Sequence, residues 1–288
     1  MIYVLKNNYL QVKINSLGAE VVEILDKDNI NRMHTPNKET WDRVSPVLFP
    51  QISKTRDFLY RVNGKDYYMP RHGFVRNSEI DVITKTDESI VFLIKDNEET
   101  LKVYPYHFEF YIKYELNKNS LKASFNVVNK GDSNLLFMLG GHPGFKVPLF
   151  DNESYEDYYV EFEKNETVEA MQVIDGYLAN VYKPCLNNEN KIYLRHEMFD
   201  PDAIIMKNLK STYVEIKTDK NDKKIKFYFS DFEILAIWSK TLLNANFVCL
   251  EPWNGIQKDF VVDHEKMGVL SINPHSHKEY SYTIEVIN

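Results

Sequence analysis

Three short segments of the chain combine a titratable side chain with residues that restrict the backbone, and each could carry chemistry. The segments are Gly140-Gly141-His142-Pro143-Gly144-Phe145, Pro70-Arg71-His72-Gly73-Phe74-Val75-Arg76 and Leu250-Glu251-Pro252-Trp253-Asn254-Gly255. Glycine permits close backbone approach, and proline removes a backbone donor and ends regular strand pairing. Because an imidazole titrates near neutral pH, His142 and His72 are candidates for proton transfer.

The third segment adds a carboxylate that is suited to act as a base. Residues 247–250 predict a buried strand, so Glu251 is expected to emerge at its end, held by a rigid element and facing a cleft. The flat ring of Trp253 is suited to stacking on the C–H face of a sugar. Taken alone, each residue also fits a structural role, as a salt-bridged strand end for Glu251 or a hydrogen-bonded loop residue for His72 and His142.

The elements that position these segments are predicted to be β-strands. The chain shows short runs of β-branched and aromatic residues, separated by clusters of Asn, Asp, Gly and Lys. Nine such runs predict strands at residues 9–14, 89–94, 108–115, 120–128, 158–162, 213–217, 225–229, 247–250 and 280–287. Residues 116–120 and 220–224 are expected to be hairpin turns. Helical periodicity is scarce, and only residues 40–44 and 259–267 could each hold a turn or two.

Length and composition indicate one folded unit. The 288 residues contain 43% hydrophobic residues and only 10 Gly and 11 Pro, and they show no repeat and no linker-like tract. We therefore expect a single domain over residues 1–288. Because one open sheet of so many strands would leave a face and its edges exposed, two large packed sheets are expected.

Charge, cysteine usage and hydropathy exclude several classes of function. A net charge of −7 without any basic run argues against a nucleic-acid partner. Cys185 and Cys249 lack the spacing of a metal site or a redox motif and are expected to be reduced thiols. No stretch approaches a membrane span, and the first residues do not resemble an export signal, so a cytoplasmic location is expected.

Four further histidines favour structural interpretations. His107 lies in a predicted strand entry, where core packing is expected, whereas His264, His275 and His277 lie in polar loops and are expected at the surface. Residues 67–69 could line a pocket or pack in the core.

Together, these segments resemble the aldose 1-epimerases, also called galactose mutarotases, and within that family the bacterial LacX-like branch. The resemblance covers most of the chain and rests on motifs in the family's order: Leu48-Phe49-Pro50 with Lys54 and Arg56, Arg71-His72-Gly73-Phe74, Gly141-His142-Pro143-Gly144-Phe145, Phe199-Asp200-Pro201-Asp202-Ala203 and Glu251-Pro252-Trp253. It implies an all-β β-supersandwich of the galactose mutarotase type, with few short helices.

The resemblance also implies a reaction, which is the interconversion of the α and β anomers of a free hexose such as galactose or glucose, without a metal or another cofactor. Glu251 matches the general base that takes the proton from the C1 hydroxyl, and His142 matches the general acid that protonates the ring oxygen. His72 and Asp202 match residues that bind the substrate. Opening a hemiacetal requires exactly this kind of proton exchange, so a carboxylate and an imidazole on opposite sides of the reacting centre suffice.

One departure from the family concerns an arginine that usually follows the Phe-Pro motif. Lys54 stands at its position, and Arg56 lies two residues later, on the same side if the segment is a strand. Lysine lacks the planar donor fork of arginine, so either residue could fill the role.

Two further functions compete with this one. Mutarotation of a hexose 6-phosphate would need cations around the phosphate, which Lys54, Arg56, Arg71 and Arg76 could supply. A sugar-binding or regulatory protein could keep the pocket without turnover. A glycoside hydrolase is disfavoured, since that chemistry usually needs two carboxylates. The expected partner is a monosaccharide, and a homodimer formed through an exposed sheet edge is left open.

Overall fold

The computed structural model describes residues 1–240, 242–257 and 263–288. Strands contain 54% of the residues and helices 8%, which confirms the all-β class. The helices are α1 (Glu98–Val103) and the 3-10 turns η1 (Arg56–Phe58), η2 (Val75–Asn77), η3 (Tyr155–Asp157), η4 (His196–Phe199) and η5 (His264–Lys266). Within the described ranges, no helix is long and apolar enough to cross a membrane.

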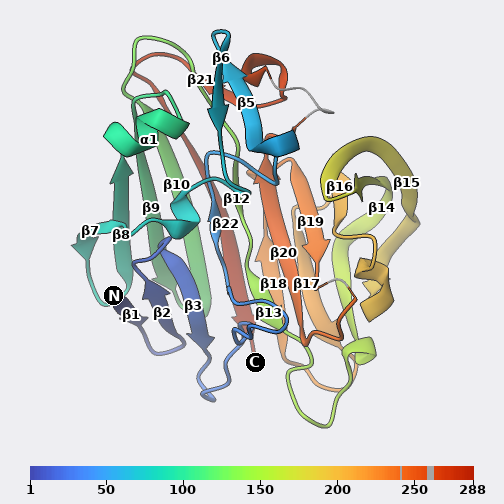
Figure 1. Cartoon of the computed structure of the whole chain (residues 1–288). Helices are drawn as coiled ribbons and strands as arrows, with labels where there is room; N and C mark the ends of the chain where they lie inside the picture. Colours follow the sequence, from blue (N-terminus) through green and yellow to red (C-terminus); the bar gives the residue numbers. More distant parts are fainter. Residues whose placement is uncertain (241, 258–262) are drawn as a thin grey trace.

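Fifteen strands join into one large, strongly bent sheet (Figure 1). They are β4 (Val47–Leu48), β7 (Asp81–Lys85), β8 (Ser89–Lys95), β9 (Phe108–Asn117), β10 (Ser120–Asn129), β12 (Leu139–Gly141), β13 (Gly144–Lys146), β14 (Tyr158–Ile174), β15 (Tyr177–Tyr193), β16 (Ile204–Lys207), β17 (Tyr213–Thr218), β18 (Lys224–Tyr228), β19 (Ile234–Trp238), β20 (Phe247–Asn254) and β22 (His277–Ile287). Their order is β4-β12-β20-β19-β16-β14-β17-β18-β22-β10-β9-β8-β7, with β13 on β20 and β15 on β14.

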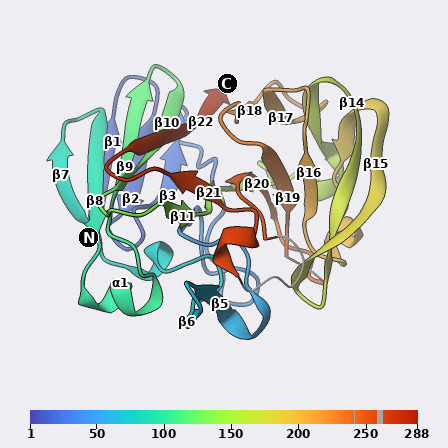
Figure 2. The same ribbon diagram turned by 90° about the horizontal axis from the view of Figure 1, so that it is seen from above.

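The sheet bends back on itself, so that β7–β10 lie on one side of the molecule and β14–β17 on the other (Figure 2). The expectation of two separate large sheets is therefore corrected to one continuous sheet. Smaller sheets complete the supersandwich: β1 (Ile2–Lys6), β2 (Gln11–Asn15) and β3 (Glu20–Leu25) form one, β5 (Leu59–Val62) pairs with β6 (Lys65–Tyr68), and β11 (Leu135–Phe137) pairs with β21 (Leu270–Ile272).

Period-two alternation explains the strands that build the core. In β9, alternate residues from Phe108 to Leu116 are buried, while the residues between them are partly exposed. The three-stranded sheet packs beside this region, since the Tyr3 ring of β1 contacts the Phe92 ring of β8 edge to face. Just before β3, the carbonyl oxygen of Ala19 accepts a hydrogen bond from the Tyr114 hydroxyl at 2.8 Å. All nine predicted strand runs overlap observed strands.

The structure differs from the sequence predictions at three places. β14 continues twelve residues beyond the predicted run and pairs with β15, whose polar, largely exposed sequence carries little alternation. Residues 40–44 form no helical turn, and Trp41 instead bridges to Asn37. Residues 259–262 of the other predicted helical segment lie outside the described residues, and only the 3-10 turn η5 is found beyond them.

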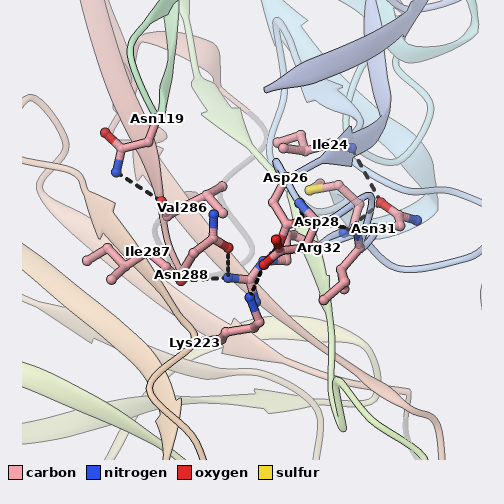
Figure 3. Close-up of polar contacts among 12 residues, drawn as sticks. Ile24, Asp26, Asp28, Asn31, Arg32, Asn119, Lys223, Val286, Ile287 and Asn288 are labelled. Carbon is pink, nitrogen blue, oxygen red and sulfur yellow. Dashed lines mark hydrogen bonds and ion pairs between the residues drawn. The ribbon is translucent and has the colours of Figure 1, made fainter. Parts of the chain in front are cut away.

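A buried ion pair lies within the loop after β3, and its arginine links this loop to the end of β22 (Figure 3). Arg32 Nε lies 3.2 Å from Asp26 Oδ2, both side chains are almost fully buried, and an Arg32 guanidinium N–H donates to the Ile287 carbonyl oxygen at 2.7 Å. The same loop supports β13, because the His34 N–H donates to the Gly144 carbonyl oxygen at 2.8 Å. The ion pair therefore helps to hold the segment that follows His142.

Candidate active site

The odd-numbered face of β20 forms the floor of a cavity. Glu251 and Trp253 line this cavity, and Cys249 packs on the same face against two tryptophans, whereas Val248 and Leu250 point into the main core. Glu251 pairs with Ala236 in the interior of the strand, so the expectation that it stands at a strand end is wrong. A carboxylate only 2% exposed in mid-strand needs a polar partner.

His142 supplies that partner from the bend between β12 and β13. Its Nε2 lies 3.2 Å from Glu251 Oε2, within hydrogen-bonding distance, and both side chains are buried. Pro143 interrupts the strand, as predicted. The flanking glycines have ordinary φ values, and a Cβ at Gly140 would lie 2.7 Å from the Trp253 ring. These glycines therefore permit close packing of the floor rather than an unusual backbone.

His72 lies beside this pair, with its ring 5.8 Å from that of His142 and nearly perpendicular to it. The backbone N–H of Ser53 donates to His72 Nδ1 at 3.2 Å, so the neutral ring carries its proton on Nε2 and can donate there. His72 has a positive φ of 64°. The next residue, Gly73, is obligatory, because a Cβ there would lie 2.1 Å from the Phe49 carbonyl oxygen.

Asp202 reaches the cavity from the loop between η4 and β16. Its backbone φ is 109°, and its Oδ1 accepts a hydrogen bond from the Ala203 N–H at 2.8 Å. Positive φ at non-glycine residues costs about 1–3 kcal/mol and is concentrated at functional sites. Two of the predicted site residues, His72 and Asp202, carry this strain.

The cavity has a volume of about 260 Å³, a size that suits a small ligand such as one sugar ring. All three tryptophans of the chain line it, and Trp41 and Trp238 pack on the His142 ring with centroids 4.9 and 5.4 Å away. Sequence reasoning identified only Trp253. Because the chain has only three tryptophans, their rarity could have pointed to Trp41 and Trp238 as candidate cavity residues.

The cations predicted around the site divide into two groups. Arg71 and Arg76 line the cavity, together with Lys240, which sequence reasoning missed. Lys54 and Arg56 are absent from its lining.

The structure bears on whether Lys54 or Arg56 could fill the role of the family's arginine. Arg56 is exposed in η1, so the argument that residues 54 and 56 share a strand face is wrong. Lys54 instead lies over the ring of Tyr177, with its Nζ 4.3 Å from the ring centroid.

The surroundings of Glu251 and His142 shift the pKa values of these two groups in opposite directions. Burial and the nearby Asp202 raise the pKa of Glu251 well above its usual range, and the Trp253 N–H offsets only part of this rise. Burial and the charge of Arg76 lower the pKa of His142. Both directions favour a protonated Glu251 beside a neutral His142, an arrangement in which the carboxyl group can donate to His142 Nε2 at 3.2 Å.

Within the part of the chain that the structure describes, one group of three donors on this floor lies close enough together to hold a metal ion. One ligand atom from each of His142, Cys249 and Glu251 lies within 4.8 Å of the other two. Burial and the Glu251 charge raise the pKa of the Cys249 thiol well above its usual range. Cys185 is also a free thiol.

The other histidines lie away from the cavity. His107 is exposed and bonds Asp96 at 2.8 Å, so the prediction of core packing is wrong. His264 is buried, with its Nδ1 3.1 Å from the Tyr106 hydroxyl, so the surface prediction is wrong there. His275 and His277 are exposed, as predicted. Of residues 67–69, Met69 packs in the core and none lines the cavity.

Similarity to known proteins places the chain among carbohydrate epimerases of the β-supersandwich class. The family model for aldose 1-epimerases matches residues 1–266, and the chain belongs to this family. The plasmid-encoded protein LacX of Lactococcus lactis subsp. lactis is 32% identical, with 99% of each chain covered. The LacX-like resemblance is thus confirmed.

Solved structures agree with this assignment. A galactose mutarotase related enzyme from Lactobacillus acidophilus is 35% identical, with a TM-score of 0.96 over 100% of this chain and 98% of that one. A galactose mutarotase-like protein from Lactobacillus casei is 28% identical, with a TM-score of 0.94 over the whole of both chains.

Proposed function

We propose that the protein interconverts the α and β anomers of a free hexose such as galactose or glucose, with Glu251 and His142 as its catalytic residues. The contact of 3.2 Å between Glu251 and His142 carries this proposal. The hydroxyl that loses a proton and the ring oxygen that gains one are bonded to the same carbon, C1. Two adjacent groups therefore serve them better than groups on opposite sides, which was the expectation from sequence.

The reaction needs one exchangeable proton shared by Glu251 and His142, and the opposed directions of their pKa shifts favour that state. Transfer of that proton from Glu251 to His142 along their contact yields the carboxylate and the imidazolium. Glu251 then takes the proton of the C1 hydroxyl while His142 gives its proton to the ring oxygen, and the bond between C1 and that oxygen breaks. Rotation about the bond between C1 and C2 and the reverse transfers close the ring as the other anomer and restore the pair.

The surrounding residues orient the sugar. His72 Nε2–H donates toward the ring oxygen, and Asp202 accepts from hydroxyl groups. Trp41, Trp238 and Trp253 offer apolar surface to C–H groups and exclude water, which strengthens electrostatic interactions inside the cavity.

Polarimetry on freshly dissolved α-anomer tests the proposal. The protein is expected to speed the approach of α-D-galactose or α-D-glucose to anomeric equilibrium in proportion to its concentration. If no common aldose is accelerated while calorimetry detects sugar binding, the protein is a sugar-binding module and the enzymatic proposal is wrong.

The opposed pKa shifts predict the pH dependence of kcat/KM. The pair loses function when it gains a second proton, at the lowered pKa of His142, or loses its only proton, at the raised pKa of Glu251. The acid limb of the profile should therefore lie below pH 6.5, the ordinary histidine value. An acid limb centred at or above that value would contradict the assignment.

A hexose 6-phosphate is the second candidate substrate, because Arg71, Arg76 and Lys240 line the same cavity. Parallel assays on glucose and glucose 6-phosphate separate the two. We expect the free sugar to be preferred, since Asp202 adds negative charge to this cavity. A clear preference for the phosphate ester would reverse the substrate assignment.

A further inference from the structure

Aromatic packing, rather than a second hydrogen bond, orients the ring of His142. Its Nε2 faces Glu251, whereas its Nδ1 is buried and makes no hydrogen bond to any of the described residues. The rings of Trp41 and Trp238 lie against it, with centroids 4.9 and 5.4 Å away. Because proton transfer requires that donor and acceptor be held in place, the positions of these two rings bear on turnover.

The two tryptophans differ in how the backbone holds them. Trp238 ends strand β19 and pairs with Cys249 of β20, so the sheet fixes its position. Trp41 belongs to the irregular connection between β3 and β4, in a tight turn where the Asn37 N–H donates to the Trp41 carbonyl oxygen at 2.8 Å. This turn needs a further anchor to hold the indole against His142.

His34 provides that anchor. Its Nε2 lies 3.0 Å from the Trp41 carbonyl oxygen, and burial lowers the pKa of His34, so the neutral ring carries its proton on Nε2 and donates it. The rings of His34 and Trp41 are also stacked, with centroids 5.5 Å apart. His34 is itself fixed on the sheet, because its backbone N–H donates to the Gly144 carbonyl oxygen at 2.8 Å and its ring lies 4.3 Å from that of Phe247.

We propose that His34 is a positioning residue, which holds Trp41 against His142 through its hydrogen bond to the Trp41 carbonyl oxygen. His34 is absent from the lining of the cavity, so it touches neither the sugar nor the transferred protons. This inference rests on the proposed function, because it names a residue that supports the same reaction. Loss of the bond should let the indole move and misplace the His142 ring relative to Glu251, which lowers turnover more than substrate binding.

Polarimetry on two amide variants tests the proposal. In His34→Asn the amide nitrogen is bonded directly to Cγ and cannot take the place of Nε2, which lies two bonds from Cγ. In His34→Gln the amide nitrogen also lies two bonds from Cγ and can donate to the Trp41 carbonyl oxygen. Since small misplacements cost up to about a hundredfold, we expect kcat to fall about tenfold in His34→Asn and less than about threefold in His34→Gln, with KM nearly unchanged. His34→Leu also lacks the donor and should show the same loss as His34→Asn.

A double variant tests whether the effect passes through Trp41. The Trp41→Ala protein has no indole to hold in place, so the addition of His34→Asn should lower its kcat by less than about twofold. A further tenfold loss in this background would show that His34 acts independently of Trp41 and would overturn the inference.

His264→Leu is the matched control, because His264 is also buried and its Nδ1 lies 3.1 Å from the Tyr106 hydroxyl, away from the cavity. It should lower stability in urea unfolding and leave kcat unchanged, and circular dichroism checks that each variant is folded. Wild-type kcat in His34→Asn and His34→Leu, a loss confined to KM, or a His34→Gln variant as slow as His34→Asn would overturn the inference while leaving the proposed function intact. An inactive wild-type protein would instead refute the proposed function.

Discussion

Glu251→Gln is expected to lower kcat/KM for anomer interconversion by roughly a thousandfold, within the range of about 10²–10⁴ that positioned proton transfer contributes. The amide keeps the size of the carboxyl group but cannot accept the proton of the C1 hydroxyl. It also leaves His142 without the group that exchanges a proton with it at 3.2 Å. Polarimetry with α-D-galactose or α-D-glucose measures the loss, and His142→Asn should produce a similar one.

Cys249→Ala provides the matched control for Glu251→Gln. Cys249 lies two residues earlier on the same face of β20 and is equally buried, but it takes no part in the proposed proton transfer. Its replacement should change kcat/KM much less than the glutamine variant does. A Glu251→Gln protein that retains activity within tenfold of wild type would rule out Glu251 as the base.

Arg32→Ala is expected to lower the free energy of unfolding by about 3–5 kcal/mol, since it leaves the Asp26 carboxylate buried without its charged partner. The Ile287 carbonyl oxygen also loses its guanidinium donor. Against a typical total of about 5–15 kcal/mol, this loss is large. Urea unfolding followed by circular dichroism measures it.

Two comparisons isolate the buried charge as the cause. Lys223→Ala removes an ion pair from the same cluster, but its partner Asp28 is 48% exposed, so about 0–1 kcal/mol should be lost. The double variant Asp26→Asn, Arg32→Met should be more stable than Arg32→Ala, because no unpaired charge remains. Equal losses in Lys223→Ala and Arg32→Ala would show that burial of the pair is unimportant.

The sequence predicted the strands that alternate and the chemistry of three segments, because both depend on local patterns. The alternation of β9 and β10 follows from one buried face, and the bend at His142 follows from Pro143. β15 escaped prediction because most of its residues face solvent at the edge of the sheet, where no apolar period is required.

The arrangement within the site depends on contacts between distant parts of the chain, which local patterns do not encode. Trp41 and Trp238 come together only through packing around His142 and β20. The closeness of His142 and Glu251 follows from β13 pairing with β20. Likewise, Arg56 was predicted to point to the same side as Lys54 because the segment was taken as a strand. Arg56 lies in a 3-10 turn instead, so this alternation does not apply to it.

A crystal structure of Glu251→Gln with bound galactose tests the central claim most directly, since it shows which atoms of the sugar lie at residues 251 and 142. The account predicts the C1 hydroxyl within hydrogen-bonding distance of the residue 251 side chain and the ring oxygen within that distance of His142 Nε2. A galactose bound in this cavity with C1 directed at Gly176, in the turn between β14 and β15, and its C6 hydroxyl at His142 would contradict it.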